Sequence, residues 1–326
     1  MNVVCFADKF KIIAVGDTTI VHCTLSIVNC KKGDSDMKTR IIVAAVAIPV
    51  LLAVIFLLPP WAFGILLGAV SALCAVEFMM ATRVDTNPRI IGYAAVSAFL
   101  IPLVQSFPGI SMGGLFVALL LLIALFVEAI LAYDTDRAIP FSFVGLTFFA
   151  GGVIPLLLGT LAVLRAIPEG MLFGDFGSGG LFFDGRVYVL IPIAIAFISD
   201  AGGYFAGFFF GQRKLIEKIS PKKTIEGSLG GFAAALAFML IYCLVMILAF
   251  GAEYNLLAAA LYAIFGSTVT QLGDLAFSMI KREYGKKDFG SLIPGHGGML
   301  DRFDSMILLA PFITVLVFWL PVFLQG

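Results

Sequence analysis

The sequence predicts an all-α fold, a polytopic transmembrane bundle of about nine helices with the N-terminus inside and the C-terminus outside. Hydrophobic residues make up 61% of the 326 residues and charged residues only 13%, against about 25% charged in soluble domains. Apolar runs close to the length of about 20 residues that crosses a bilayer follow one another along the chain. The basic residues gather in alternate loops, as they do in multi-pass membrane proteins.

The predicted helices follow from these apolar runs, taken in order. At the first boundary, Pro59 and Pro60 interrupt a nearly continuous run. Because proline ends or kinks a helix, this stretch forms either a hairpin of two helices or a kinked entry into the membrane. An odd number of helices places the two termini on opposite sides of the membrane. The runs cover residues 41–58, 61–82, 90–106, 113–133, 141–165, 186–210, 229–250, 255–280 and 303–323.

The distribution of Lys and Arg sets the expected orientation, because positively charged loops stay in the cytoplasm. If the segment before the first helix is inside, the outer side holds only Arg165 and Arg186. We therefore expect a multi-pass protein of the inner (plasma) membrane with its chemistry facing the cytoplasm. From Lys38 onward, the inner side then holds fifteen basic residues: Lys38, Arg40, Arg83, Arg89, Arg137, Arg213, Lys214, Lys218, Lys222, Lys223, Lys281, Arg282, Lys286, Lys287 and Arg302.

Residues 1–36 differ from the rest in composition, and they lack the basic start and compact apolar core of a signal peptide. Met37, followed by a short basic flank, has the character of a natural start. We interpret 1–36 as an upstream extension of the gene, with a short cytoplasmic tail as the alternative. Residues 37–326 are expected to form one catalytic transmembrane domain, with N-terminal helices in 37–165 and catalytic helices in 186–326.

Four carboxylates fall inside the predicted helices: Glu77, Glu128, Asp200 and Asp274. Such a charge costs about 2.5–3.5 kcal/mol at the centre of a membrane helix and is a candidate functional residue. Asp200 and Asp274 lie near the cytoplasmic ends of their helices, so both can line a pocket open to the cytosol. For Glu77 and Glu128 we favour a hydrogen bond to a neighbouring helix over a role in that pocket.

The segment 278–305, SMIKREYGKKDFGSLIPGHGGMLDRFDS, concentrates the residues typical of a phosphate and metal site. It carries five basic residues, four of them within 281–287, and one of the two histidines (His296). It closes with a pair of aspartates, Asp301 and Asp304, which share a helix face. Carboxylates beside a basic, glycine-rich stretch suit Mg²⁺ with a polyphosphate, because this hard ion takes oxygen ligands and keeps water and phosphate in its shell. Gln271, Asp274, Ser278 and Lys281 form a polar stripe that leads into it.

Two preceding segments have alternative interpretations. Gly203, Gly207 and Gly211 lie on one helix face with Asp200 nearby, and small-residue helix packing explains the glycines but not the aspartate. The loop 213–223 has five basic residues, which suit either the binding of a substrate phosphate or contact with anionic lipid.

These motifs together resemble the phosphatidate cytidylyltransferase (CDP-diacylglycerol synthase) family of integral membrane enzymes. The C-terminal pattern is long: Ser278, Lys281-Arg282, Lys287-Asp288, Pro294-x-His296-Gly297-Gly298 and Asp301-Arg302-x-Asp304-Ser305. The segments QLGD at 271–274 and SPKKTIEG at 220–227 are similar as well, and the likeness runs from residue 37 nearly to the end. Gly203, Phe208 and Gln212 depart from the usual family residues.

The resemblance implies that the protein converts CTP and phosphatidic acid into CDP-diacylglycerol and pyrophosphate with Mg²⁺. The phosphate of the lipid would be the nucleophile, so catalysis would require positioning and charge neutralisation and no Ser, Cys or His nucleophile. The expected partners are CTP, phosphatidic acid and membrane lipids, without nucleic acid. A homodimer through the glycine-rich helix at 186–210 is left open.

The resemblance also suggests roles for single residues. Asp274 and Asp301 would hold the metal. The phosphates would be bound by Lys222, Lys223, Lys281, Arg282 and Lys287. His296, Gly297 and Gly298 would shape the nucleotide pocket, and Arg302 would neutralise the leaving pyrophosphate. Ser220, Thr224, Glu226 and Tyr204 complete the expected substrate-binding set.

Two alternatives remain at this point. Another CTP-dependent lipid transferase or a polyprenol kinase would share the motifs, and would differ in whether CTP gives up its cytidylyl or its γ-phosphoryl group. A secondary transporter of an anionic solute also has intramembrane carboxylates and glycine-broken helices. We disfavour the transporter because nearly all of the polar chemistry lies on one side.

Overall fold

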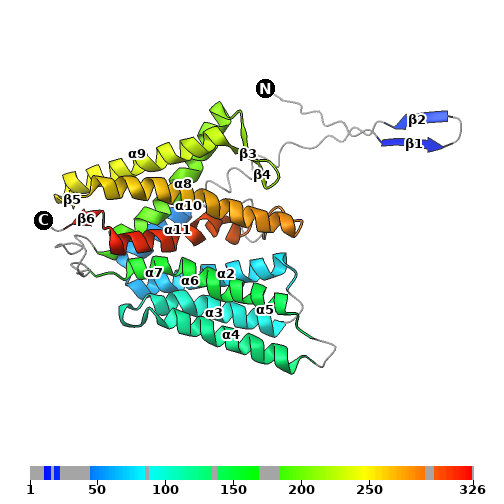
Figure 1. The fold of residues 1–326 in the computed structure, drawn as a ribbon, viewed down its shortest axis with the longest axis horizontal. Coiled ribbons are helices and arrows are strands. Elements are labelled where there is room, and N and C mark those ends of the chain that lie inside the picture. Colours follow the sequence, from blue (N-terminus) through cyan, green and yellow to red (C-terminus); the bar gives the residue numbers. More distant parts are fainter. Residues whose placement is uncertain are drawn as a thin grey trace.

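The computed structural model describes residues 11–15, 18–22, 45–84, 88–133, 138–168, 184–290 and 297–324. Long helices lie side by side, with their axes roughly along one direction (Figure 1). In this described part, eight helical segments are long and apolar enough to cross a membrane, and a shorter apolar helix spans Ala45–Leu57. The predicted fold class, an all-α multi-pass membrane bundle, is confirmed.

The first half of the bundle begins with the helix Ala45–Leu57. It continues through α2 (Pro60–Ala81), α3 (Pro88–Gln105), the short 3₁₀ turn η1 (Pro108–Ile110) and α4 (Gly113–Leu131). The next span, Phe141–Arg165, is built from α5 (Phe141–Phe148), the π-helical turn η2 (Phe149–Val153), α6 (Ile154–Leu158) and α7 (Thr160–Arg165).

The second half begins with α8 (Gly185–Phe210) and a hairpin of β3 (Lys214–Ile216) with β4 (Ser220–Thr224). The hairpin strands are antiparallel and pair Lys214 with Thr224 and Ile216 with Ser220. There follow α9 (Ile225–Phe250), β5 (Glu253–Tyr254), α10 (Leu256–Glu283), α11 (Leu300–Trp319) and β6 (Phe323–Leu324), and β5 and β6 pair with each other.

The two proline residues at 59 and 60 separate two helices, as the sequence suggested. The first helix ends at Leu57 and α2 begins at Pro60, where proline is favoured because the first helical turn needs no N–H partner. The expectations for 1–36 stay predictions, although this region contains an antiparallel hairpin of β1 (Lys11–Val15) and β2 (Thr18–His22) that the sequence did not lead us to expect. The orientation of the termini also stays a prediction.

Side-chain caps explain where three helices of the second half begin. Asp184 accepts a hydrogen bond from the N–H of Arg186 before α8, Thr224 accepts one from Gly227 before α9, and Asn255 accepts one from Ala258 before α10. Each cap satisfies a backbone N–H that has no partner within the helix. The cap at Thr224 fixes the point at which the β3–β4 hairpin turns back into the membrane.

Glycines allow α8 and α9 to approach each other closely. A Cβ placed on Gly227 would lie 2.7 Å from the carbonyl oxygen of Gly203, and one on Gly230 would lie 2.9 Å from that of Gly202. Larger side chains would force the two backbones apart. Small-residue packing against α9 therefore accounts for this glycine face, and a homodimer through α8 stays a prediction.

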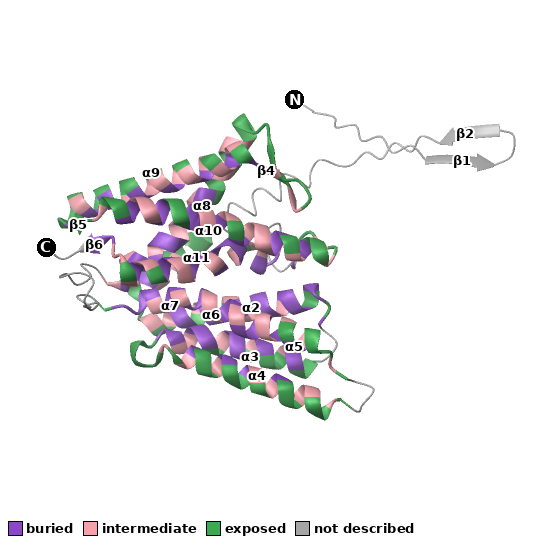
Figure 2. Ribbon diagram, viewed as in Figure 1, coloured by how far each residue is buried: buried purple, intermediate pink, exposed green. Residues whose placement is uncertain are grey.

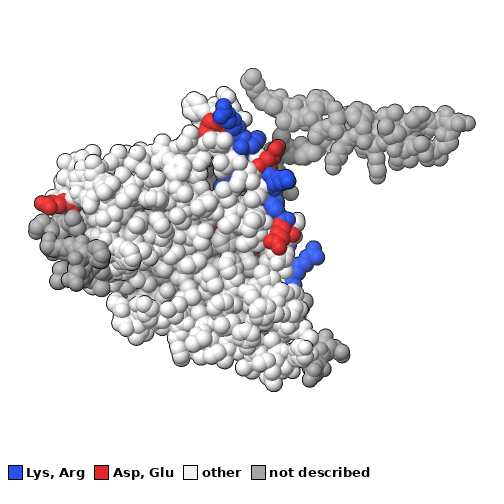
Figure 3. All heavy atoms as spheres, in the orientation of Figure 1, with Lys and Arg blue, Asp and Glu red and all other residues white. Residues whose placement is uncertain are grey.

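The exterior of the bundle is apolar. Figure 2 shows exposed residues along the outer faces of α4 and α9 and buried residues towards the centre. Leu119 on α4 and Leu248 on α9 are 50% and 78% exposed, as expected where lipid and not water covers the helices. On the face seen in Figure 3, charged side chains gather at the ends of the bundle and leave its flank without charge.

Candidate active site

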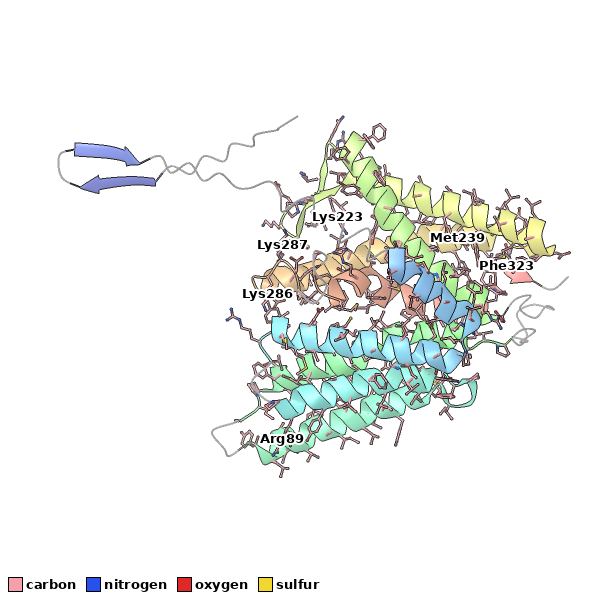
Figure 4. All side chains as sticks on the ribbon, turned by 180° about the vertical axis from the view of Figure 1, so that it is seen from behind. Arg89, Lys223, Met239, Lys286, Lys287 and Phe323 are labelled. Carbon is pink, nitrogen blue, oxygen red and sulfur yellow. The ribbon has the colours of Figure 1, made fainter. Side chains whose placement is uncertain are left out.

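A cavity of about 690 Å³ lies between α8, the β3–β4 hairpin, α10 and the start of α11. It is at the end of the bundle where Lys223, Lys286 and Lys287 are labelled in Figure 4. Its lining combines acidic, basic, small and aromatic side chains: Ser199, Asp200, Gly203, Tyr204, Gly207, Phe208, Lys214, Leu215, Lys222, Lys223, Thr224, Gly227, Ser228, Gln271, Asp274, Lys281, Asp288, Asp301, Arg302 and Asp304.

Four aspartates predicted as metal ligands meet in this cavity although they come from three helices. Asp200 is on α8, Asp274 on α10, and Asp301 and Asp304 on α11. The spacing of three residues puts the last two on the same face of α11. Helix packing therefore brings carboxylates that are distant in the sequence to one cavity, and we call these four aspartates the acidic wall.

Two lysines neutralise part of this wall. Nζ of Lys223 lies 2.6 Å from Oδ2 of Asp274. Nζ of Lys281 lies 2.9 Å from Oδ1 of Asp301 and 3.5 Å from Oδ2 of Asp304. Lys281 is only 8% exposed, and a buried charge needs such partners because desolvation is costly. The lysine ammonium groups can also bind phosphate oxygens.

The carboxylate of Asp301 has a fixed orientation because hydrogen bonds hold both of its oxygens. While Oδ1 accepts from Lys281, Oδ2 accepts hydrogen bonds from the backbone N–H groups of Phe289 (2.9 Å) and Gly298 (3.1 Å). The ring of Phe289 also lies 5.4 Å from Nζ of Lys281, a distance at which the ring face attracts a cation.

The polar stripe expected on α10 is confirmed. Gln271, Asp274 and Lys281 all line the cavity, and the hydroxyl of Ser278 donates to Oδ1 of Asp274 at 3.2 Å. The stripe therefore faces the interior of the protein and not the lipid. In this way α10 supplies a carboxylate (Asp274), a hydroxyl that donates to it (Ser278) and a positively charged side chain (Lys281).

Serines that the sequence did not single out lie behind the charged groups. Ser228 donates to the side chain of Gln271, whose Nε2 donates to Oγ of Ser267 at 3.2 Å. Ser267 in turn shares a 2.7 Å hydrogen bond with Ser199. Small hydroxyl residues inside apolar runs gave no signal in the sequence, since serine is also common where membrane helices pack.

Other residues were missed for different reasons. Asp288 lines the cavity but was noted only as part of a motif. Lys214 and Leu215 enter the lining from β3, and only the fold of the hairpin brings them there. Phe208 also lines the cavity, at a position noted only as a departure from the family residues.

Several predicted site residues do line the cavity: Tyr204, Lys222, Lys223, Thr224, Lys281 and Arg302. Others are not among the lining residues in the described part of the chain: Ser220, Glu226, Arg282 and Lys287. Arg282 instead donates to the carbonyl oxygens of Ile219 (3.2 Å) and Lys286 (3.1 Å). Glu226 accepts from the backbone N–H groups of Gln212 and Arg213. Both side chains hold the shape of the segments around the cavity.

The glycine-rich segment is only partly described. His296 lies outside the described residues, so its predicted role stays a prediction. Gly297 has φ +84°, a conformation that glycine adopts without strain. Gly298 supplies one of the two backbone donors to Asp301. These two glycines therefore shape the turn that leads into α11.

The donor set of the cavity suits a hard cation. Its carboxylates offer the oxygen ligands that Mg²⁺ prefers. Among the residues that the structure describes, no three His, Cys, Asp or Glu side chains are grouped closely enough to hold a metal ion by themselves. This arrangement fits an ion that one or two carboxylates share with water and phosphate oxygens, which is the usual mode of Mg²⁺ at nucleotide sites.

The fold and the site define a class: a multi-pass membrane protein with a charged, phosphate-compatible cavity at one end of an apolar bundle. A model of the Cytidylyltransferase family matches residues 38–320, and the chain belongs to this family. It is similar to the phosphatidate cytidylyltransferase of Bacillus subtilis (strain 168), with 35% identity over 290 residues that cover 86% of this chain and 98% of that protein.

Two further relatives carry the same name. The phosphatidate cytidylyltransferase of Haemophilus influenzae is 32% identical over 298 residues, or 87% of this chain and 99% of that protein. That of Staphylococcus haemolyticus is 39% identical over 146 residues, which cover 43% of this chain and 55% of that protein. The resemblance seen in the motifs is therefore confirmed over most of the chain.

Proposed function

We propose that this protein transfers the cytidylyl group of CTP to phosphatidic acid and releases pyrophosphate, forming CDP-diacylglycerol. The observation that carries the proposal is the cavity itself, which gathers five aspartates and four lysines at the end of an apolar bundle. Family membership and the names of relatives that the chain matches over nearly their full length support the same reaction.

The reaction is a single displacement at phosphorus. An oxygen of the lipid phosphate bonds to the α-phosphorus of CTP, and the bond from that phosphorus to the oxygen bridging to the β-phosphate breaks. The electron pair leaves with pyrophosphate. A phosphate monoester is already largely ionised at neutral pH, so the protein needs no general base to prepare the nucleophile, and its task is to position and neutralise charge.

The lysines of the cavity are suited to that task. Lys223 and Lys281 are paired with aspartates, and phosphate oxygens of the substrates would replace or share these partners. Lys222 and Arg302 lie on the same lining and supply further positive charge to the phosphates. Cations fixed in a partly desolvated site stabilise developing negative charge more strongly than water does.

Mg²⁺ is part of the proposal. Asp274 and Asp301 would hold it, while Asp304 and Asp200 would either support these two carboxylates from behind or bind a second, monovalent or divalent, cation. Bound Mg²⁺ would offset the negative charge of the triphosphate and of the leaving pyrophosphate. The hydrogen bonds from Phe289 and Gly298 would keep the Asp301 carboxylate turned towards the cavity.

The cavity is proposed to face the cytoplasm of a bacterial plasma membrane. The segments 213–223 and 281–287, which include most of the hairpin and the end of α10, carry nine of the fifteen basic residues counted on the predicted inner side, and such segments stay cytoplasmic. CTP would then enter from the cytosol, whereas the lipid would come from the surrounding membrane.

The test is turnover by the purified protein in detergent, with CTP, phosphatidic acid and Mg²⁺ supplied and both CDP-diacylglycerol and pyrophosphate measured. Wild type is expected to form the two products in equal amounts. Asp274→Asn and Asp301→Asn are expected to remain folded and to lose activity by about 100- to 1,000-fold, the range for removing one preorganised electrostatic group. Glu128→Gln, which alters a carboxylate paired with Arg89 at 3.7 Å, serves as the matched control.

Other products would contradict the proposal in distinct ways. If CTP yields CDP and a phosphorylated lipid, the protein is a kinase, whose reaction breaks the bond to the γ-phosphate. If neither product forms with phosphatidic acid under any metal condition, the assigned reaction is wrong.

A further inference from the structure

Glu77 lies near the C-terminal end of α2, in the half of the bundle that supplies none of the described lining residues of the cavity. It is only 7% exposed. Its Oε2 accepts a hydrogen bond of 2.9 Å from the backbone N–H of Leu300, a residue 223 positions away and the first of α11. The hydrogen bond to a neighbouring helix expected for Glu77 is present, and the neighbour is the helix that carries Asp301 and Asp304.

The start of α11 needs such a partner. Met299 precedes the helix and provides no side-chain cap, although the first backbone N–H groups of a helix have no partner within it. An acidic group also interacts favourably with the positive end of a helix. Glu77 thus caps α11 from another helix.

The segments on both sides of 291–296 pack against the same carboxylate. A Cβ placed on Gly290 would lie 2.5 Å from Oε1 of Glu77, and one on Gly298 would lie 2.5 Å from Oε2. Only glycine leaves room for the carboxylate at both places. Glu77 is therefore enclosed by Gly290, Gly298 and Leu300.

These same backbone positions orient Asp301. The two N–H donors to its Oδ2 belong to Phe289 and Gly298. Phe289 precedes Gly290 in the sequence, and Gly298 is in direct contact with Glu77. The rings of Phe289 and Phe78 stack at 5.9 Å, which ties the segment to the residue after Glu77. A shift at Glu77 would move the donors of Asp301.

We propose that Glu77 is a positioning residue: by holding the Leu300 N–H and packing on the two glycines, it fixes the start of α11 and thereby the direction of the Asp301 carboxylate. The inference deepens the proposed function and rests on it for the kinetic part of its test. A purely structural role, in which Glu77 only joins α2 to α11, would affect stability and leave the metal dependence unchanged.

The test compares Glu77→Ala and Glu77→Gln with wild type, and uses Glu128→Gln as the control for losing an intramembrane carboxylate elsewhere. The amide of glutamine can still accept from Leu300, whereas alanine cannot. We expect Glu77→Ala to need about 10- to 100-fold more Mg²⁺ for half-maximal activity and to lose kcat, as for outer partners of metal ligands. Glu77→Gln should remain close to wild type.

Two measurements do not depend on activity. Mn²⁺ bound in the presence of CTP, followed by electron paramagnetic resonance, should weaken in Glu77→Ala by a similar factor. Amide hydrogen exchange over residues 298–303 should be roughly 5- to 30-fold faster in that variant, the effect of losing one to two kcal/mol of local stability. Glu77→Gln should restore both.

The proposal is overturned if Glu77→Ala keeps the wild-type Mg²⁺ requirement and Mn²⁺ affinity, even if its melting temperature falls. It is also overturned if Glu77→Gln loses as much activity as Glu77→Ala while its amide exchange stays normal, because the negative charge would then act directly. If the wild type itself makes no CDP-diacylglycerol, the proposed function fails, and the exchange and Mn²⁺ data still decide the role of Glu77.

Discussion

Each end of the bundle has a buried cation beside a cavity, but the two cations are held by different kinds of group. At one end Lys281 pairs with the side chains of Asp301 and Asp304. At the other, next to a cavity of about 410 Å³, Arg165 donates to the backbone carbonyl oxygens of Ile55 (2.8 Å) and Leu58 (2.9 Å).

The difference separates a reactive site from a structural one. The carbonyl oxygens at the C-terminal end of the helix Ala45–Leu57 have no partner within the helix, so Arg165 completes its backbone hydrogen bonding. Those acceptors cannot exchange Arg165 for a ligand without exposing the helix end. By contrast, Asp301 and Asp304 can bind a metal ion in place of Lys281. Lys281 can in turn bind a phosphate in place of these aspartates. Burial of a charge alone therefore does not mark an active site.

The largest effect on the difference between the two ends is expected for Lys281→Met. Removing the lysine leaves two buried carboxylates without their cation, a change that costs about 3–5 kcal/mol, and it also removes a phosphate ligand. We expect activity to fall by about 100- to 1,000-fold and the melting temperature in detergent to fall too. Lys281→Arg should recover stability more than activity, because guanidinium keeps the charge but changes the geometry. Full activity in Lys281→Met would place the site elsewhere.

The matching change at the other end is Arg165→Met. Two carbonyl oxygens lose their donor, at a cost of about 1–3 kcal/mol, so the melting temperature should drop. Both kcat and the KM for CTP should stay at their wild-type values, since Ile55 and Leu58, which accept the hydrogen bonds of Arg165, are not among the described lining residues of the catalytic cavity. Kinetic parameters measured below the melting temperature check this, and a changed KM would show that the two ends are coupled.

A weaker effect is expected for Lys223→Met. Its ion pair with Asp274 is 26% exposed on each side, so solvent already screens part of the interaction. We expect little change in melting temperature and roughly a tenfold rise in the KM for CTP, as for the loss of one charged hydrogen bond. A rise in the KM for phosphatidic acid alone would assign Lys223 to the lipid phosphate.

The smallest effect is expected for Arg186→Gln at the structural end. Arg186 pairs with Asp184 at 3.0 Å and its side chain is 48% exposed. Exposed pairs contribute about 0–1 kcal/mol. Melting temperature and turnover should both stay within error of wild type, and a large loss of either would mean that this end does more than close the bundle.

Much of the fold and of the acidic wall could be predicted from sequence. The apolar runs gave the helices because each residue of a membrane span must be compatible with lipid, and the cost of a buried charge singled out Asp200 and Asp274. The three-residue spacing of Asp301 and Asp304 placed them on one face. All four line the cavity.

The rest depended on tertiary packing. Lys281 and Arg282 are adjacent, and both were predicted to bind phosphate, yet neighbouring residues on a helix point about 100° apart. Lys281 faces the cavity whereas Arg282 bonds to backbone carbonyl oxygens outside it. The contact from Glu77 to Leu300 links helices at opposite ends of the sequence, and no local pattern encodes such a pair.

That long-range contact also sets an order of events during biosynthesis. The 223 residues between Glu77 and Leu300 take roughly 10–45 s to translate at about 5–20 residues per second. Through that interval α2 can already lie in the membrane while its partner has not yet left the ribosome. We therefore expect the enzyme to stay inactive until its last span inserts, so that a chain released early cannot consume nucleotide.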